Sequence, residues 1–316
     1  MSSTSGGAFT AISDYFLGRG GVVYGAAFDS NFKVSHLRCT NPKDCDRLKG
    51  SKYVQSDLAD IFPLVKEDLE RDTEVMFSGT PCQVAGLKGY LGTEHKGLFC
   101  CDLVCHGVPS PSLFRKYLLY LKEKDTAEVI GVEFRNKSRG WRNFSFAVQT
   151  QKGKTVVPFN DDPYCYLFSI NIMLRPACYS CKFSNMSRVS DITMGDFWGG
   201  EISLHEFMDD KGVSLVLVNT AKGRAVFDSI RGVVDVKESS SMDCLQPNLI
   251  KPTPKSPHTD KFWEDYAVKG FNYVISRYTL KNPLVRIDQA LRLWVGRAWF
   301  FPYLKRAKSI LAGGWS

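Results

Sequence analysis

The fold is best inferred from Glu74-Val-Met-Phe-Ser-Gly-Thr-Pro-Cys-Gln-Val-Ala-Gly-Leu-Lys-Gly-Tyr-Leu91. After Glu74, its next five residues are apolar or small, and the first six predict a strand. The following twelve predict a helix, because Pro81 suits the first helical turn. A second strand is predicted over Leu98–Val104. A strand, a helix and another strand in this order are typical of parallel strands joined by a crossover helix.

Strand and helix patterns alternate on both sides of this stretch. The fold class that they predict is α/β, with a mostly parallel mixed sheet and flanking helices. From Val129 onward the pattern changes to a β-rich extension that carries a cysteine-containing loop, and Tyr164–Leu174 reads as a buried helix. We expect three parts: an α/β core over 1–128, a β-rich α+β portion packed on it over 129–246, and a Pro-rich linker with a basic, aromatic, helical tail over 247–316.

The composition is that of an ordinary globular protein, with 44% hydrophobic and 23% charged residues, which excludes intrinsic disorder. Net charge is +8, but residues 270–316 hold eight Lys or Arg and one Asp, so the rest of the chain is near neutral. We therefore expect no nucleic-acid partner. The first 18 residues contain no Lys or Arg and no long apolar run. We expect no export signal, no membrane span, a cytoplasmic location and reduced cysteines.

Four of the cysteines stand where they could share a ligand. Cys178 and Cys181 form a CxxC pair in a loop, and Cys82 and Cys105 each follow a predicted strand. The carboxyl ends of parallel strands lie on one edge of a sheet, so these thiolates could form one all-cysteine metal site. The ligand type alone does not distinguish zinc from an iron–sulfur cluster. The CxxC pair could also be a redox dithiol or a chance pair. We expect buried, inert thiols at Cys39, Cys45, Cys165 and Cys244, with Cys100 and Cys101 facing opposite ways.

Three segments rich in glycine and hydroxyl groups could bind phosphate at helix starts or in loops, namely Ser5-Gly-Gly-Ala8, Lys49–Ser56 and Gly79-Thr-Pro81. Each by itself is more often a cap or a turn, but together they make a nucleotide cofactor reasonable. Arg135-Asn-Lys-Ser-Arg-Gly-Trp-Arg142 could receive an anionic, planar ligand by charge and stacking. Spacing alone favours a solvated hairpin turn there. Asp196-Phe-Trp198 reads as an aromatic plug of the core.

Six segments between residue 5 and about residue 230 together resemble the coenzyme F420 hydrogenase/dehydrogenase beta-subunit family. They are Ser5-Gly-Gly-Ala-Phe-Thr10, Gly50-Ser-Lys-Tyr-Val-Gln-Ser56, Phe77-Ser-Gly-Thr-Pro-Cys-Gln83, Cys105-His-Gly-Val-Pro-Ser110, Arg175-Pro-Ala-Cys-Tyr-Ser-Cys181 and Ser190-Asp-Ile-Thr-Met-Gly-Asp-Phe-Trp198. The resemblance implies FAD and a [4Fe–4S] cluster. The cluster ligands would be Cys82, Cys105, Cys178 and Cys181. The flavin would lie near Ser5, Gly6, Gly7, Phe9, Gly50, Ser51, Lys52, Tyr53, Gln55, Ser56, Gly79, Thr80 and Pro81.

The resemblance also implies a function. Family members pass electrons between one-electron iron–sulfur carriers and a two-electron acceptor through the flavin, and that acceptor is a deazaflavin in archaeal members. Others occur in polysaccharide gene clusters, which suggests a role in polysaccharide biosynthesis. Many relatives carry an N-terminal ferredoxin-like module whose cysteine run is not found in this sequence. We expect either that a separate ferredoxin or ferredoxin-like subunit supplies electrons or that the chain is truncated. The alternatives are a non-redox zinc-containing binding module and a scaffold of a glycan-synthesis complex. No catalytic residue is assigned.

The C-terminal tail has one apolar helical face, made by Leu284, Ile287, Leu291, Trp294, Val295 and Ala298. Aromatic residues and Lys/Arg follow it. This combination suits peripheral contact of residues 280–310 with an anionic membrane surface, here the inner membrane face. The other interpretation, which we favour slightly, is a C-terminal helix docked on the body with a solvated basic face.

Overall fold

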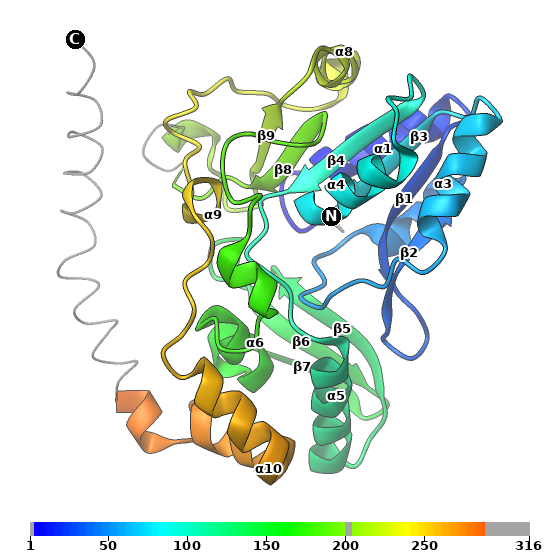
Figure 1. Ribbon diagram of the computed structural model, residues 1–316. Coiled ribbons are helices and arrows are strands. Elements are labelled where there is room, and N and C mark those ends of the chain that lie inside the picture. Colours follow the sequence, from blue (N-terminus) through cyan, green and yellow to red (C-terminus); the bar gives the residue numbers. More distant parts are fainter. Residues whose placement is uncertain (1–2, 200–203, 288–316) are drawn as a thin grey trace. The chain divides into compact units, whose positions relative to one another are not determined.

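The structure is a computed structural model in which residues 3–199 and 204–287 are described (Figure 1). The chain divides into two compact units, Met1–Pro257 and His258–Ser316. All the residues predicted to bind a cofactor or metal belong to the first unit. The two units are therefore described separately.

The first unit is built on a mixed sheet, which within the described residues has six strands in the order β2-β1-β3-β4-β8-β9. Its strands are β1 (Val22–Phe28), β2 (Val34–Cys39), β3 (Val75–Gly79), β4 (Leu98–Leu103), β8 (Ile192–Asp196) and β9 (Ser214–Val218). Strands β1, β3, β4 and β8 run parallel, while β2 and β9 pair antiparallel at the two edges. The prediction of a mostly parallel mixed sheet is confirmed.

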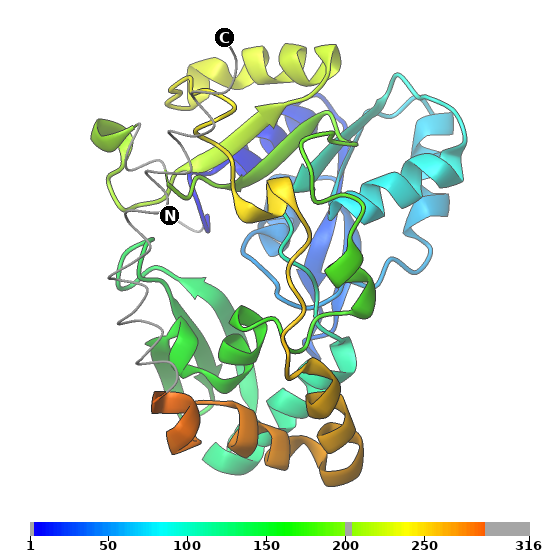
Figure 2. The same ribbon diagram turned by 60° about the vertical axis from the view of Figure 1, so that its left-hand side comes forward.

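Helices cover both faces of this sheet because successive side chains of its strands point to opposite faces. On one face lie α1 (Ala8–Gly18), α2 (Pro42–Cys45), η1 (Asp46–Leu48) and α8 (Ala221–Ile230), and on the other lie α3 (Ile61–Glu70) and α4 (Pro81–Leu91). Figure 2 shows α8 above the sheet. Cys101 packs in the first apolar cluster and Cys100 in the second, so the prediction that they face opposite ways is confirmed.

A second, antiparallel sheet of the described residues has the order β5-β6-β7, with bounds Val129–Asn136, Ser145–Thr150 and Gly153–Pro158. It lies below the larger sheet in Figures 1 and 2. Helices α5 (Pro111–Asp125) and α6 (Pro163–Ser169) pack with it through the aromatic rings of Phe114, Tyr117, Phe134, Phe146 and Tyr164. The strands of this sheet lie in the β-rich portion that the sequence predicts from residue 129 onward.

The helix predicted over Tyr164–Leu174 is too long, because α6 ends at Ser169. Asn171 adopts a left-handed backbone (φ 61°), which an L-residue disfavours inside a helix. The chain then turns, and Leu174 forms an isolated bridge with Pro109. This turn brings the CxxC loop toward the end of β4.

Short helical segments complete the first unit. They are η2 (Phe159–Asp161), η3 (Pro176–Ser180), η4 (His205–Phe207), η5 (Arg231–Val233) and α9 (Pro247–Ile250). In the second unit, α10 (Thr259–Tyr278) contains a kink at Gly270, whose φ is 78°. No helix in the described part of the chain is both long and apolar enough to cross a membrane. Residues 288–310, which make up most of the tail with the two interpretations of membrane contact and docking on the body, lie outside the described residues.

Candidate functional site

The four cysteines predicted to share a ligand lie together at the carboxyl ends of β3 and β4. Cys105 follows β4, Cys82 lies in the first turn of α4, and Cys178 lies in η3 with Cys181 directly after it. Burial above all, and the neighbouring thiols of Cys82, Cys178 and Cys181 in addition, raise the pKa of Cys105 to about 12. The Cys178 thiol is in turn close to those of Cys82 and Cys181. We call these four residues the cysteine corner.

Cys82 owes its place to the start of α4. Thr80 is the N-cap and forms a capping box with Gln83, and Pro81 occupies the first helical turn. The Thr80 Oγ1 atom lies 3.1 Å from the Cys82 sulfur. Cys82 is exposed, whereas Cys105, Cys178 and Cys181 are half-buried.

Cys105 and Cys178 are held by two loops that run side by side. The Arg175 N–H donates to the Val108 carbonyl at 3.0 Å, beside the Pro109–Leu174 bridge. The N–H groups of Gly107 and Val108 donate to the sulfurs of Cys105 and Cys178, and these bonds oppose the rise in pKa that burial causes at both thiols. Hydrogen bonds to sulfur favour the thiolate, which is the form that binds metal.

Gly107 is required between these loops. Its φ is 129°, and a Cβ atom there would lie 2.8 Å from Leu174 Cδ1 and 3.2 Å from Cys178 Cβ. Any side chain at this position would push the CxxC loop away. Gly107 therefore sets how closely Cys178 approaches Cys105.

A buried ion pair holds the segment after the CxxC pair against β4. Arg188 Nη2 lies 3.0 Å from Asp102 Oδ1, and the two side chains are 2% and 0% exposed. Arg188 also donates to Thr193 Oγ1 in β8 and to the Phe183 carbonyl. One guanidinium thus ties the loop after Cys181 to β4 and β8.

The donor set of the corner fits an iron–sulfur cluster. Four thiolates with backbone N–H donors are the ligand type such clusters take. Among the described residues no three His, Cys, Asp or Glu side chains converge on the position of a single metal ion. The sulfurs around tetrahedral zinc lie about 3.8 Å apart, since each is about 2.3 Å from the metal. A cluster presents a separate iron to each ligand, so its sulfurs need not converge on one point.

The predicted flavin loop, Gly50–Ser56, lies against the cysteine corner. The Gln55 N–H donates to the Pro109 carbonyl at 3.1 Å, and Arg175 Nη1 donates to Gln55 Oε1 at 2.6 Å. Tyr53 stacks on Phe168 of α6, with ring centroids 4.5 Å apart and planes 16° from parallel. This loop therefore contacts both segments that carry Cys105 and Cys178.

Within the same loop, Gly50 has a φ of 84° and Ser51 is half-buried. Lys52 turns back on η1, and its Nζ donates to the carbonyls of Arg47, Leu48 and Lys49 at 3.1, 2.9 and 2.8 Å. Burial lowers the pKa of Lys52 to about 7. Because three carbonyls occupy its donors, Lys52 closes the loop onto η1 in this structure and does not extend from it.

Ser56 joins the loop to the end of β3 through His36. The His36 Nδ1 atom lies 2.6 Å from Ser56 Oγ, and its Nε2 lies 3.0 Å from the Ser78 carbonyl oxygen. A carbonyl only accepts, so Nε2 carries the proton and Nδ1 accepts from the Ser56 hydroxyl. Burial lowers the pKa of His36 to about 4, which keeps the ring neutral. Ser56 is thereby fixed beside Gly79, Thr80 and Pro81.

The first predicted segment, Ser5–Phe9, lies beside β9. Ser5 Oγ donates to the Val213 carbonyl at 2.8 Å, and a Cβ atom on Gly6 would lie 2.8 Å from the Ser214 nitrogen. Gly7 is the N-cap of α1 with a φ of 94°, and Phe9 packs in the apolar cluster beneath that helix. In the described part of the chain, no hydrogen bond joins this segment to the flavin loop or to the thiols.

A polar cluster between the two sheets includes Arg135 and Trp141, from the stretch for which the sequence allowed an anionic, planar ligand but favoured a solvated turn. Arg135 Nη1 lies 2.7 Å from Asp196 Oδ2, and Trp141 Nε1 donates to Asp196 Oδ1 at 3.1 Å. The rings of Trp141 and Trp198 stack 4.6 Å apart. The solvated-turn interpretation is wrong for Arg135, whose side chain is 5% exposed, and for Trp141, which is fully buried. Arg135 and Trp141 flank the turn and point inward to meet the end of β8.

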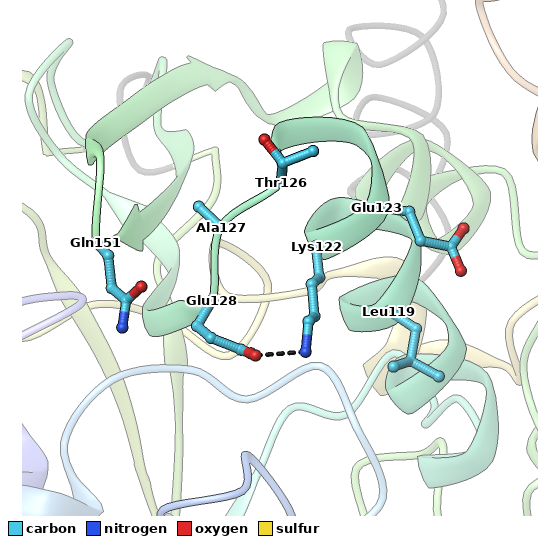
Figure 3. Close-up of a pocket in the computed structure, with 7 residues that line it drawn as sticks. All are labelled: Leu119, Lys122, Glu123, Thr126, Ala127, Glu128 and Gln151. Carbon is cyan, nitrogen blue, oxygen red and sulfur yellow. Dashed lines mark ion pairs between the residues drawn. The ribbon is translucent and has the colours of Figure 1, made fainter.

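A surface hollow elsewhere contains none of the predicted site residues. Figure 3 shows its lining residues, which are Leu119, Lys122, Glu123, Thr126, Ala127, Glu128 and Gln151. Its Lys122–Glu128 ion pair is exposed to solvent. The hollow offers neither thiols nor a phosphate-binding loop, and we do not treat it as the functional site.

Comparisons with known proteins bear on the family and the fold of the chain. Residues 72–241 match the family described as the C terminus of the coenzyme F420 hydrogenase/dehydrogenase beta subunit. No curated protein sequence matches the chain. Among solved structures, a chain of the xenon-derivatised F420-reducing [NiFe] hydrogenase complex from Methanosarcina barkeri is similar in fold, with a TM-score of 0.50 and 19% identity. The alignment covers 73% of this chain and 74% of that one.

Proposed function

This chain belongs to the coenzyme F420 hydrogenase/dehydrogenase beta-subunit family, and we propose that it is an iron–sulfur flavoprotein oxidoreductase. In this proposal it passes electrons between a [4Fe–4S] cluster and a two-electron acceptor by way of FAD. The observation that carries the proposal is the cysteine corner, in which three distant segments bring four thiols to the carboxyl end of a parallel sheet. Ligands of α/β proteins collect at that end.

The chain's own residues prepare the corner for a cluster. Cys82, Cys105, Cys178 and Cys181 would supply the thiolates. The N–H groups of Gly107 and Val108 would donate to two of these sulfurs, and such bonds stabilise negative charge on sulfur. When bound, the cluster would accept and release single electrons.

The neighbouring loops would bind the flavin. Gly50–Ser56 meets the cysteine corner through Gln55, and its Ser56 hydroxyl is fixed beside the start of α4. Gly79, Thr80 and Pro81 begin that helix, whose first N–H groups suit a phosphate. Ser5, Gly6, Gly7 and Phe9 would contribute from the start of α1. When bound, FAD would exchange single electrons with a cluster and pairs of electrons with a substrate.

A separate electron carrier would supply the cluster. We propose a ferredoxin or a ferredoxin-like subunit as this partner and a small molecule, a deazaflavin or another redox substrate, as the acceptor. The structurally similar chain from Methanosarcina barkeri comes from a hydrogenase complex, which supports association with a partner subunit. Exposed Cys82 marks the side of the corner that such a carrier would approach.

The test is an absorption spectrum of anaerobically purified protein, together with counts of iron and acid-labile sulfide. We expect flavin bands and about four irons per chain. A colourless protein that contains zinc, or no metal, would contradict the proposal and favour a non-redox binding module or scaffold. Stoichiometric flavin without iron would likewise exclude the cluster while leaving the flavin loops in place.

A further inference from the structure

Arg135 is a buried cation in which two of the three guanidinium nitrogens have no hydrogen-bond acceptor among the described residues. Its side chain is 5% exposed, and Nη1 pairs with Asp196. In the described part of the chain, Nε and Nη2 have no hydrogen-bond acceptor, although neither atom reaches solvent. A buried guanidinium N–H without an acceptor is costly, so such donors usually have a partner. The missing partner can be a ligand.

The unused donors lie on one edge of the guanidinium, and this edge can donate hydrogen bonds to two oxygens at once. Elsewhere in this chain, Arg19 binds both oxygens of Glu74 through Nε and Nη2, at 2.9 and 3.1 Å. Arg38 binds both oxygens of Asp68 through the same two atoms, at 2.7 and 2.8 Å. Arg135 thus presents a free fork that matches two coplanar acceptor atoms.

The fork is held rigidly. The Arg135 guanidinium carbon lies 3.7 Å from the centre of the Phe144 ring and 5.3 Å from that of Trp198. Trp141 stacks on Trp198 and also donates to Asp196. Because Asp196 is held in this way, it stays on Nη1 and leaves the opposite edge open. A planar group bound there would lie among aromatic rings.

The local charges favour an anion. Lys137 lies near both Arg135 and Asp196, and its Nζ donates to the Lys211 carbonyl at 2.7 Å. Nearby Asp209 is paired with Lys211. Two cations, Arg135 and Lys137, therefore face the single carboxylate of Asp196, and one positive charge remains. A monoanionic group would neutralise the cluster.

The cluster also adjoins the flavin loop. The Tyr53 phenol lies beside Arg135, whose charge and whose hydrogen bond to the phenol both oppose the rise in the Tyr53 pKa that burial causes. A ligand on the free fork would therefore lie close to the loop that we propose for the flavin. A redox substrate must reach that place.

We propose that Arg135 binds a carboxylate of the small-molecule substrate through Nε and Nη2. The inference deepens the proposed function and rests on it in taking the ligand to be the redox substrate. Two coplanar acceptors also occur on the pyrimidine edge of a flavin. The experiment must therefore separate a substrate carboxylate from the flavin itself.

The probe is benzoate, a planar aromatic carboxylate, with uncharged benzamide as the matched control. Calorimetric titration of the full-length protein as purified, under anaerobic conditions, would compare wild type with Arg135→Lys. A second variant, Arg139→Gln, removes an exposed arginine from the same hairpin. We expect benzoate to bind wild type and Arg139→Gln alike, and to bind Arg135→Lys at least about tenfold more weakly, because lysine keeps the charge but loses the fork. Benzamide should not bind measurably.

Flavin and iron counts on the same samples identify each failure. Equal benzoate affinity in wild type and Arg135→Lys, or no benzoate binding to wild type, overturns the proposal. Loss of flavin from Arg135→Lys without any benzoate binding also overturns it, and assigns the fork to the flavin. If a protein purified without flavin or iron still binds benzoate through Arg135, the anion site stands and the proposed redox function fails.

Discussion

The ten cysteines occupy two kinds of environment. Six are buried among apolar side chains, and four lie on loops or at a helix start at the ends of the strands. Burial raises the pKa of Cys100 in the core to about 12, and it raises that of Cys105 in the corner equally. The pKa therefore does not distinguish Cys105 from Cys100. The corner differs in having four thiols together, backbone N–H donors aimed at sulfur, and one exposed member.

The strongest way to break this comparison is to replace one cysteine of each kind. Cys178→Ser should lose most of the iron, because a cluster needs all four ligands. Cys165→Ala, in the interior, should keep its iron and lose only about 1–2 kcal/mol of stability through a small cavity. Iron and sulfide counts with thermal unfolding check both. Equal iron loss from two equally folded variants would show that the corner is not the ligand set.

A second test asks how far the corner depends on the core beneath it. Asp102→Asn leaves the charge of buried Arg188 without its partner, and should destabilise the protein by about 3–5 kcal/mol in denaturant unfolding. The matched control is Asp209→Asn, whose pair with Lys211 is exposed and should contribute about 1 kcal/mol or less. Similar losses in the two variants would mean that Arg188 does not anchor the loop after Cys181.

The smallest effect is expected from a substitution that adds one methyl group between the two loops. Gly107→Ala should destabilise the protein by about 2–3 kcal/mol, since it combines a disfavoured positive φ with a clash against Leu174 and Cys178. Gly92→Ala also has a positive φ, 70°, but its Cβ would meet nothing within 4 Å. We expect about 1 kcal/mol there. Iron content should fall in Gly107→Ala alone; a normal count would show that the loops can separate without disturbing the thiols.

The core sheet could be predicted because its strands are short apolar runs separated by helices of clear period. The β-rich end was harder to predict. The early end of α6 depends on the left-handed Asn171 and on the bridge between Leu174 and Pro109, a contact 65 residues apart in sequence. Such contacts leave no local pattern. In the same way, α3 begins only at Ile61, because Asp57 pairs with Ser35 of β2.

The candidate site divides in the same way. The four cysteines could be grouped from sequence because the carboxyl ends of parallel strands must share an edge. The role of Lys52 in closing η1 and the burial of Arg135 could not be predicted, because each depends on a partner supplied by tertiary packing. Arg135 reads as part of a solvated turn until Asp196, 61 residues later, is placed beside it.

The four cysteines of the corner are far apart in the sequence, so they are synthesised at different times. During synthesis, Cys82 and Cys105 emerge long before Cys178 and Cys181, and β8, which lies between β4 and β9, emerges last of the parallel strands. Until β8 arrives, β4 is an open edge and Arg188 has not reached Asp102. A nascent chain therefore holds two of the four thiols without the means to position the others. Under the proposed function, the cluster would be loaded only after β8 has arrived, as a late step of maturation.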